Sequence, residues 1–247
     1  KYELTRRASD LGMLVPKTTE ISLGSSLPRS VPEGFVQMSY PAVLKAADLL
    51  VEADLSLCKP APVYVSSAEE AWRVVRGLES KTGVMLLQER IVGKGLGVFA
   101  LCKGGKSYLV FSHQRLLEKP PSGGVSVLSE SLGLHAPPVG AALRLFEDLS
   151  WEGVAMAEFK VDSCGRAFLM EVNPRFWGSL QLAVSCGYDY PYWFSALAFA
   201  DSEEEKQRIC LQLESLAPYA EGRRLRWLLG TLDHALIRLK NEGPKAA

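Results

Sequence analysis

Two glutamates and one asparagine in the second half of the chain have the types and spacing to bind a divalent metal ion. The segments 153–162 and 167–173 alternate apolar and polar residues, as neighbouring β-strands do. Glu158 lies in the first segment, and Glu171 and Asn173 share one face of the second. Carboxylate and amide oxygens are hard ligands of the kind that Mg²⁺ accepts. These residues therefore predict a metal-phosphate site.

The turn between these segments sets which residues face each other. If 164–165 is a two-residue turn, Asp162 faces Ala167 and Glu158 faces Glu171. Opposed like charges are destabilising unless a cation lies between them. The alternative is a solvated hairpin face, and a longer turn would shift the pairing. The apolar residues beside the glutamates favour a buried sheet, in which carboxylates need a partner.

A second predicted hairpin has the opposite charge. With 104–105 as its turn, Leu96 faces His113 and Lys94 faces Arg115. A phosphate could relieve the repulsion between the two cations. The backbone could approach such an anion closely at three alternate glycines, Gly93, Gly95 and Gly97. A flexible hairpin without a ligand explains the same pattern.

Lys45 ends the short apolar run PAVL, where its ammonium could act as a point charge on phosphate. A surface lysine is the alternative. The chain's three histidines have no metal-ligand spacing, and no serine lies in a G-x-S-x-G motif, so a hydrolytic triad is unsupported. The aromatic residues between Trp177 and Phe194 favour core packing over a carbohydrate or base platform. We assign them no function.

The predicted elements interleave helices with antiparallel hairpins, which indicates an α+β fold. Apolar periodicity predicts helices at 1–13, 137–149, 202–213 and 221–241. A further helix is predicted to begin at a Ser67–Glu70 capping box and to end near Lys81. Short apolar or alternating runs predict strands at 42–46, 63–65, 84–90, 153–162 and 167–173.

Composition limits the class of protein. The 247 residues are 47% hydrophobic and 23% charged, as in globular proteins with a sizeable core. Lys plus Arg and Asp plus Glu are 28 each, so nucleic-acid binding is disfavoured. Five widely spaced cysteines favour a reducing compartment, and we expect neither a membrane span nor a signal peptide. We expect a cytoplasmic protein, and we expect this sequence to be only part of a longer chain.

Five segments carry a resemblance to a known family. In order they are PAVLK, LLQERIVGKGLGVFAL, HQRLLEKPPSGGVSVLSES, WEGVAMAEFK and LMEVNPRFWGSLQLA. Together they resemble the ATP-grasp superfamily over roughly residues 1–200, and most closely its predicted carboligases, which are relatives of carbamoyl-phosphate synthase. The string Glu-x-Asn-Pro-Arg, thirteen residues after Glu158, is the most specific part.

The resemblance implies an ATP-grasp fold, in which two α+β subdomains clasp a nucleotide. We expect a linker helix with its following segment at 1–36, a small subdomain at 37–91, a large subdomain with the metal hairpin at 92–200 and C-terminal helices at 201–247. The leucine stripe of the last helix needs a partner surface, either in this chain or in a second copy as a homodimer.

The resemblance also implies roles for individual residues. Lys45 matches the phosphate lysine, and Arg175 matches the arginine that steadies the transferred phosphoryl group or the acyl phosphate. The metal ligands would be Glu158, Glu171 and Asn173, and the adenine edge would lie along Gln88, Glu89, Arg90 and Ile91. Taking the 93–97 hairpin as the phosphate lid adds Lys94, His113 and Arg115 as nucleotide-binding candidates.

The activity implied is an ADP-forming ligase that uses ATP and Mg²⁺, or Mn²⁺ in its place. It would activate a small-molecule carboxylate as an acyl phosphate, which an amine, thiol or similar nucleophile then attacks. The alternatives are a non-catalytic ATP-binding or regulatory module and a phosphotransferase.

Three departures from the family pattern affect these expectations. The glycine-rich stretch expected soon after Lys45 is absent. Lys94 stands where several relatives have an acid near the ribose, so we name no ribose contact. The chain also begins near the linker helix that usually follows an N-terminal domain, which predicts that part of the substrate site lies upstream.

Overall fold

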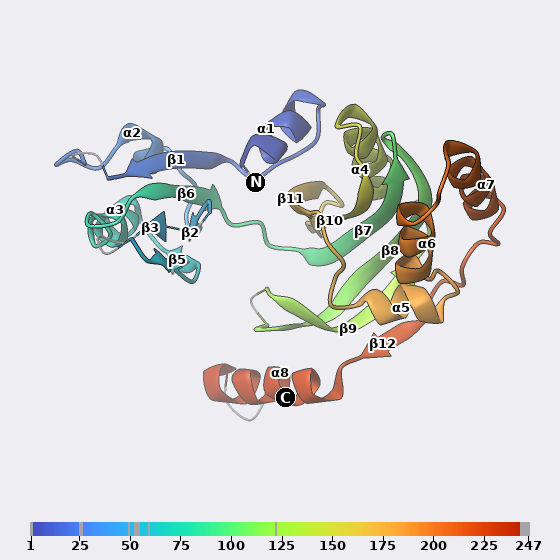
Figure 1. The fold of residues 1–247 in the computed structure, drawn as a ribbon. Helices are drawn as coiled ribbons and strands as arrows, with labels where there is room; N and C mark the ends of the chain where they lie inside the picture. The colour runs from blue at the N-terminus through green and yellow to red at the C-terminus, as the bar shows by residue number, and fades with distance from the viewer. Residues whose placement is uncertain are drawn as a thin grey trace. The chain divides into compact units, whose positions relative to one another are not determined.

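The computed structural model describes residues 2–24, 27–48, 50–51, 55–58, 60–121 and 123–242. The chain divides into two compact units, 1–92 and 93–247. Each unit has its own hydrophobic core. Figure 1 shows that each unit also has its own main sheet. Among the described residues, no helix has the length and apolar character needed to cross a membrane.

The first unit contains a four-stranded antiparallel sheet in the order β1-β6-β2-β5. Its strands are β1 (Thr18–Leu23), β2 (Ala42–Ala46), β5 (Val63–Val65) and β6 (Gly83–Glu89). A separate pair is formed by β3 (Leu50–Val51) and β4 (Leu57–Cys58). The helices of this unit are α1 (Tyr2–Asp10), α2 (Glu33–Val36) and α3 (Ala68–Arg76).

The capping box predicted before α3 is present. The Ser67 hydroxyl accepts a hydrogen bond from the Glu70 backbone N–H at 3.2 Å. The helix ends at Arg76, earlier than expected, because Gly77 follows as its C-cap. Trp72 on its apolar stripe meets Phe35 edge-on, with 5.6 Å between ring centroids. This stripe and alternate residues of the sheet form the core of the first unit.

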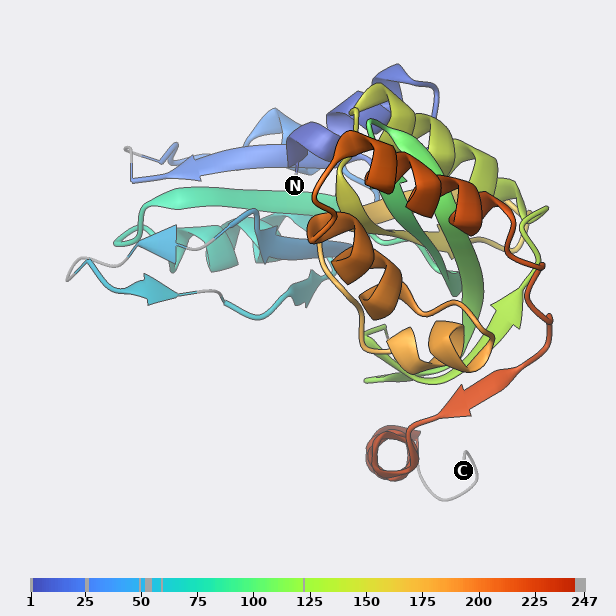
Figure 2. The ribbon, with the colours of Figure 1, turned by 45° about the vertical axis from the view of Figure 1, so that its right-hand side comes forward.

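The second unit is built on a six-stranded antiparallel sheet in the order β11-β10-β7-β8-β9-β12. Its strands are β7 (Lys94–Lys103), β8 (Lys106–Lys119), β9 (Val125–Leu132), β10 (Gly153–Val161), β11 (Ala167–Asn173) and β12 (Arg224–Arg226). Its helices are α4 (Pro137–Asp148), α5 (Leu180–Ser185), α6 (Tyr190–Ala198), α7 (Glu203–Glu214) and α8 (Leu228–Glu242). Figure 2 shows the sheet curving beside helices α5, α6 and α7.

Both faces of this sheet are buried at β7. Phe99 and Leu101 pack in a cluster with residues of α5, α6 and α7. Val98 and Ala100 point to the opposite face by strand alternation and are fully buried as well. Helix α4 contacts β7, β8 and β10 and covers that second face. Helices therefore pack on both faces of the sheet at β7.

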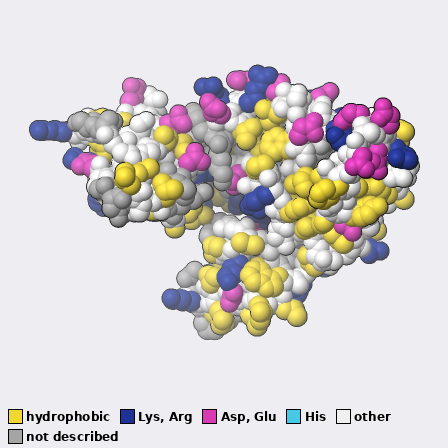
Figure 3. Space-filling model, viewed as in Figure 1, with side chains coloured by type: hydrophobic (Ala, Val, Ile, Leu, Met, Phe, Trp, Pro, Cys, Tyr) yellow, Lys and Arg dark blue, Asp and Glu magenta, His cyan; other side chains and the backbone are white. Residues whose placement is uncertain are grey.

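The single helix predicted at 221–241 is wrong in its first part. Arg224–Arg226 forms β12, which pairs with β9, and the helix α8 begins only at Leu228. The leucines of this region read as a helical stripe, but the alternation Arg-Leu-Arg fits an edge strand equally well. Leu229, Leu232 and Leu236 of α8 are 68%, 61% and 62% exposed, and Figure 3 shows hydrophobic side chains beside charged ones on the visible face of α8.

Candidate functional site

The acidic pair lies where the sequence predicts it, although the turn differs. Glu158 on β10 pairs directly with Glu171 on β11, which confirms the predicted register at this point. The pairing of Asp162 with Ala167 is wrong, because Val161 pairs with Ala167. Asp162 instead closes a longer turn by accepting bonds from the backbone N–H groups of Cys164 and Arg166, both at 2.9 Å.

A register shift next to Glu158 restores the expected pairing. Phe159 pairs with Leu169, whereas Glu158 pairs with Glu171, so the second strand carries one extra residue, Met170. This bulge offsets the longer turn by one residue. Glu158 and Glu171 consequently lie opposite each other on one face of the sheet.

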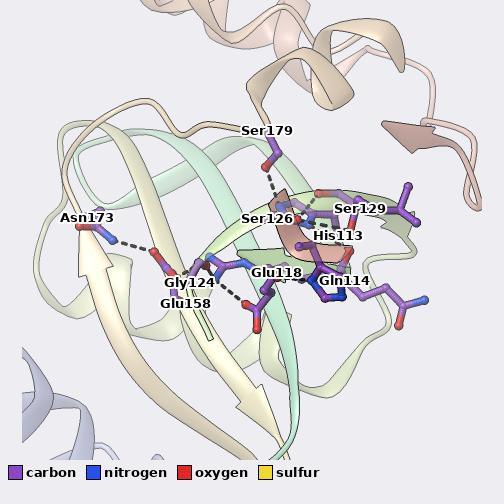
Figure 4. Close-up of polar contacts among 12 residues, drawn as sticks. His113, Gln114, Glu118, Gly124, Ser126, Ser129, Glu158, Asn173 and Ser179 are labelled. Atoms are coloured by element: carbon purple, nitrogen blue, oxygen red, sulfur yellow. Dashed lines mark hydrogen bonds and ion pairs between the residues drawn. The ribbon is translucent and has the colours of Figure 1, made fainter. Parts of the chain in front are cut away.

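Glu158 is the centre of a charged hydrogen-bond network (Figure 4). The Asn173 amide Nδ2 donates to Glu158 Oε1 at 3.0 Å. Arg115 on β8 places Nη2 2.5 Å from Glu158 Oε2 and Nη1 3.1 Å from Glu118 Oε1. Burial opposes the charge of Arg115, but the Glu158 and Glu118 carboxylates outweigh it and raise the pKa of the guanidinium. Arg115 therefore stays charged.

The oxygen atoms of this network are suitable ligands for a hard divalent cation. Glu158, Glu171 and Asn173 offer only oxygen ligands, and a carboxylate oxygen that accepts one hydrogen bond keeps a second lone pair. Arg115 neutralises part of the charge of Glu158, and Glu171 adds a second negative charge directly opposite Glu158. Within the described ranges, no group of three or more His, Cys, Asp or Glu residues has metal-binding geometry, and this set contains only two such residues.

The basic hairpin differs from its predicted register by one residue. Gly97 pairs with His113, not Leu96, because a register shift beside Cys102 displaces the two strands. The register that pairs Leu96 with Gln114 sets Gly95, not Lys94, opposite Arg115, and a Cβ atom on Gly95 would lie 2.9 Å from Arg115 Cδ. The predicted pair of opposed cations is therefore wrong, and the two carboxylates beside Arg115 balance its charge instead.

The three alternate glycines are explained by packing within the protein. A Cβ atom on Gly93 would lie 2.2 Å from the backbone oxygen of Val161. On Gly95 it would lie 2.9 Å from Cδ of Arg115, and on Gly97 it would lie 2.4 Å from the Phe99 ring. No anion is needed to account for glycine here. Gly95 in particular leaves the space that Arg115 occupies between its two carboxylates.

His113 is a buried, neutral residue that holds a serine. Its side chain is 0% exposed and stacks on Phe99, with 4.8 Å between ring centroids. Burial, and secondarily the charge of Arg115, lowers the pKa of His113 to about 3. Nε2 lies 2.9 Å from Ser179 Oγ, and Nδ1 lies 3.3 Å from the Gln114 carbonyl oxygen. Both ring nitrogens are thus engaged within the protein, which removes His113 from the set of cationic phosphate contacts.

A cavity of about 300 Å³ adjoins this network within the second unit. Arg115 and Glu158 form one part of its wall, and Arg175, Trp177 and Ser179 form another. Arg175 follows the end of β11 and is exposed, and its Nη1 donates to the Phe176 carbonyl at 3.0 Å. The structure thus brings the arginine of the Asn-Pro-Arg string to the same cavity as Glu158.

The candidates in the first unit form a separate polar group. Lys45 Nζ donates to Gln88 Oε1 at 2.8 Å, and Gln88 Nε2 donates to Thr18 Oγ1 at 3.0 Å. Lys45 lies between Leu44 and Ala46 of the core, so strand alternation places it on the opposite face of the sheet. Gln88 is buried, and its amide orients the Lys45 ammonium.

The other residues of the predicted adenine edge differ in their exposure and contacts. Glu89 Oε2 accepts a hydrogen bond from the Lys17 backbone N–H at 3.3 Å. Arg90 is exposed and lies over the Tyr64 ring at 5.2 Å, while Ile91 is buried. Their roles toward a nucleotide stay predictions.

Sequence reasoning missed three residues of the second-unit site. Glu118 lies three residues after Arg115 on β8 and forms an ion pair with it. Ser179 and Trp177 follow the Asn-Pro-Arg string and line the cavity. The sequence does point to Trp177, because it is an aromatic residue only two positions after Arg175 and must lie near the groups that Arg175 contacts. Nothing in the sequence distinguishes Ser179 from other serines.

Comparison with known proteins identifies the family. The model of the family "ATP-grasp in the biosynthetic pathway with Ter operon" matches residues 81–215, which is more than half of the chain. No curated protein sequence matches.

Solved structures with the same fold include three ligases or synthases. The L-amino acid ligase from Bacillus licheniformis is 16% identical, with a TM-score of 0.53 over 91% of this chain and 51% of that chain. The D-alanine-D-alanine ligase from Coxiella burnetii is 18% identical, with a TM-score of 0.57 over 86% and 60%. The N5-carboxyaminoimidazole synthase from Aspergillus clavatus, solved with ADP, is 12% identical, with a TM-score of 0.59 over 96% and 71%.

Two conclusions follow from these matches. The chain spans about half the length of the L-amino acid ligase and 60% of the D-alanine-D-alanine ligase, so it corresponds to part of such enzymes. The α+β fold and the ATP-grasp resemblance predicted from the sequence are confirmed. The chain belongs to the ATP-grasp family of the biosynthetic pathway with the Ter operon.

Proposed function

We propose that this chain is the ATP-grasp part of an ADP-forming ligase that joins a carboxylate to an amine or a similar nucleophile. The observation that carries the proposal is the direct pairing of Glu158 with Glu171, with Asn173 bonded to Glu158. Membership in the ATP-grasp family supports nucleotide binding. The structural relatives named above are ligases or synthases, which supports ligation over simple hydrolysis.

Each residue set would have a distinct task. Glu158, Glu171 and Asn173 would hold Mg²⁺, which when bound neutralises the charge of the transferred phosphoryl group. Lys45, oriented by Gln88, would contribute a point charge to the nucleotide phosphates. Arg175, exposed at the cavity, would bind the phosphorylated carboxylate and orient it for attack. No protein nucleophile is required.

The substrates and setting of the whole protein are also proposals. Because the chain spans only part of its structural relatives, we propose that further chain completes the substrate site. A reducing, cytoplasmic location would suit its five widely spaced cysteines.

The test is ADP release with a panel of small carboxylates and amines in the presence of Mg²⁺. Glu171→Gln keeps the shape of the side chain and removes its charge, so we expect it to abolish Mg²⁺-dependent ADP formation. Glu204→Gln is the matched control, because Glu204 is exposed on α7 away from the acidic pair. Its activity should equal that of the unmodified protein.

Two outcomes would contradict the proposal. Unchanged ADP formation in Glu171→Gln would show that the metal site is assigned wrongly. A stable phosphorylated product that forms without an amide, identified by mass spectrometry, would favour a phosphotransferase.

A further inference from the structure

Helix α8 packs on its own sheet through its more polar face. Gly230 is buried there, and a Cβ atom on it would lie 2.7 Å from a valine side chain of β9. His234 is 9% exposed, and its Nδ1 lies 2.5 Å from the Glu118 carbonyl oxygen. Asp233 forms an ion pair with Lys119 of β8. An amphipathic helix normally turns its apolar stripe toward the core, so this docking is inverted.

The apolar face of α8 points away from the sheet. At 3.6 residues per turn, five leucines fall within an arc of about 100° on the side opposite Gly230 and His234. We call them the leucine face, and each is 38–70% exposed: Leu228, Leu229, Leu232, Leu236 and Leu239. Trp227, directly before the helix, is 47% exposed. Their exposed apolar surface is on the order of 500 Å², a size at which patches commonly mark interaction sites.

We propose that the leucine face is the twofold interface of a homodimer, in which α8 packs antiparallel against α8 of a second copy. The inference is independent of the ligase activity. Two leucine faces together would bury about 1,000 Å², which is the area that a specific interface needs, and polar residues at the rim add to it.

One edge of the leucine face carries charges that are complementary to themselves. Asp233 and Lys240 are seven residues apart, which is two helical turns, so both lie on the same edge of the face. In an antiparallel twofold pair this edge meets the same edge of the other copy with its direction reversed. Lys240 of each copy then lies beside Asp233 of the other. A parallel pair would bring opposite edges together and lose both contacts.

Asp233 has room for this second cation. Its ion pair with Lys119 leaves the Asp233 side chain 42% exposed. A carboxylate has two oxygens and about four sites that accept hydrogen bonds, so it can bind two cations at once. Lys240 is exposed at the other end of the same edge.

The polar side of α8 favours a protein partner over a lipid surface. A helix that lies on a membrane exposes a polar face rich in lysine and arginine. In α8 the polar face is covered by the sheet at Gly230 and His234, and the edge of the leucine face carries an aspartate.

Sedimentation velocity at about 1–100 µM protein tests the dimer, since an interface of this area is expected to be of moderate affinity. We expect a monomer–dimer equilibrium. Leu232→Glu should weaken it about a hundredfold or more, because the substitution occurs twice in each dimer and places charge in an apolar interface. Leu211→Glu is the matched control, because Leu211 is 57% exposed on α7, outside the leucine face. It should dimerise like the unmodified protein.

Cross-linking with a carbodiimide, which joins a carboxylate to an amine without a spacer, tests the antiparallel arrangement. Within one helix Asp233 and Lys240 are about 10.5 Å apart along the axis, too far for such a bond. We therefore expect an Asp233–Lys240 cross-link only between copies, which a mixture of ¹⁵N-labelled and unlabelled protein reveals by mass spectrometry. The Asp233–Lys119 cross-link within one chain is the internal positive control.

Four results would overturn the inference. The protein could be a monomer at every concentration, it could form a dimer that Leu232→Glu leaves intact, or the dimer could give the Asp233–Lys119 cross-link without the one between copies. A monomer that binds vesicles of phosphatidylcholine and phosphatidylserine through Leu232 would instead assign the leucine face to a lipid surface. If Leu232→Glu does not fold, the sedimentation and cross-linking of the unmodified protein decide the question.

Discussion

Lowering the pH from 7 to 5 should destabilise this protein through one buried histidine. In the unfolded chain His113 has a pKa of about 6.5, whereas in the folded protein burial lowers it to about 3. The neutral form is thus favoured by folding, so its contribution to stability is complete above pH 6.5. That contribution falls as the pH decreases toward 3, because the unfolded state then binds a proton that the folded state does not.

The size of the effect follows from the two pKa values. A difference of one bound proton changes the free energy of unfolding by about 1.36 kcal/mol per pH unit. Between pH 7 and pH 5 the unfolded histidine gains most of a proton and the folded one gains almost none. The expected loss is therefore about 2 kcal/mol, which is a large part of the 5–15 kcal/mol by which proteins are typically stable.

Urea unfolding at pH 7 and pH 5 measures this loss, and NMR titration of the His113 ring measures its cause. His113→Gln preserves an acceptor near the position of Nε2 for Ser179 and cannot take up a proton. It should lose about 2 kcal/mol less than the unmodified protein over this range. His135→Asn, which replaces an exposed histidine, should keep the full dependence. Equal pH dependence in His113→Gln, or titration of the His113 ring near pH 6.5, would refute the reasoning.

Two stability predictions use matched pairs of variants and urea unfolding. Gly97→Ala should destabilise by about 1–3 kcal/mol, because its methyl group would lie 2.4 Å from the Phe99 ring, which is wedged between His113 and Trp177. Gly140→Ala on α4, whose nearest neighbour is a side-chain nitrogen at 3.8 Å, should stabilise by about 0.5–1 kcal/mol, and a loss as large as that of Gly97→Ala would contradict this account. Tyr190→Phe should cost about 1–2 kcal/mol, because its buried hydroxyl donates to backbone carbonyls at 3.0 and 3.3 Å. Tyr192→Phe, at a side chain that is 61% exposed, should cost little, and equal losses in the two tyrosine variants would refute the assignment.

The acidic pair shows how far the sequence can specify a site. Strand alternation and one assumed turn were enough to predict that Glu158 faces Glu171. The assumption about the turn was wrong, and the pairing held because Met170 bulges out of the ladder. A period-two pattern survives such a bulge where both strands are tightly packed, because a one-residue slip would bury charges and expose apolar residues.

The basic hairpin shows why the same reasoning can fail. Its turn residues were identified, but the register shift beside Cys102 moved every later pairing by one residue. No feature of the sequence near Cys102 predicts that shift. Glycine is also ambiguous in sequence, since a close ligand and a close side chain both require it. Only the structure distinguishes them, by placing Arg115 and Phe99 against Gly95 and Gly97.

Contacts between distant segments account for what the sequence could not predict. Ser179 meets His113 across 66 residues, and Arg115 meets Glu158 across 43. Local periodicity carries no information about such pairs. Even so, the α+β class and most elements follow from periodicity and capping, because helices and strands satisfy local rules that this chain obeys.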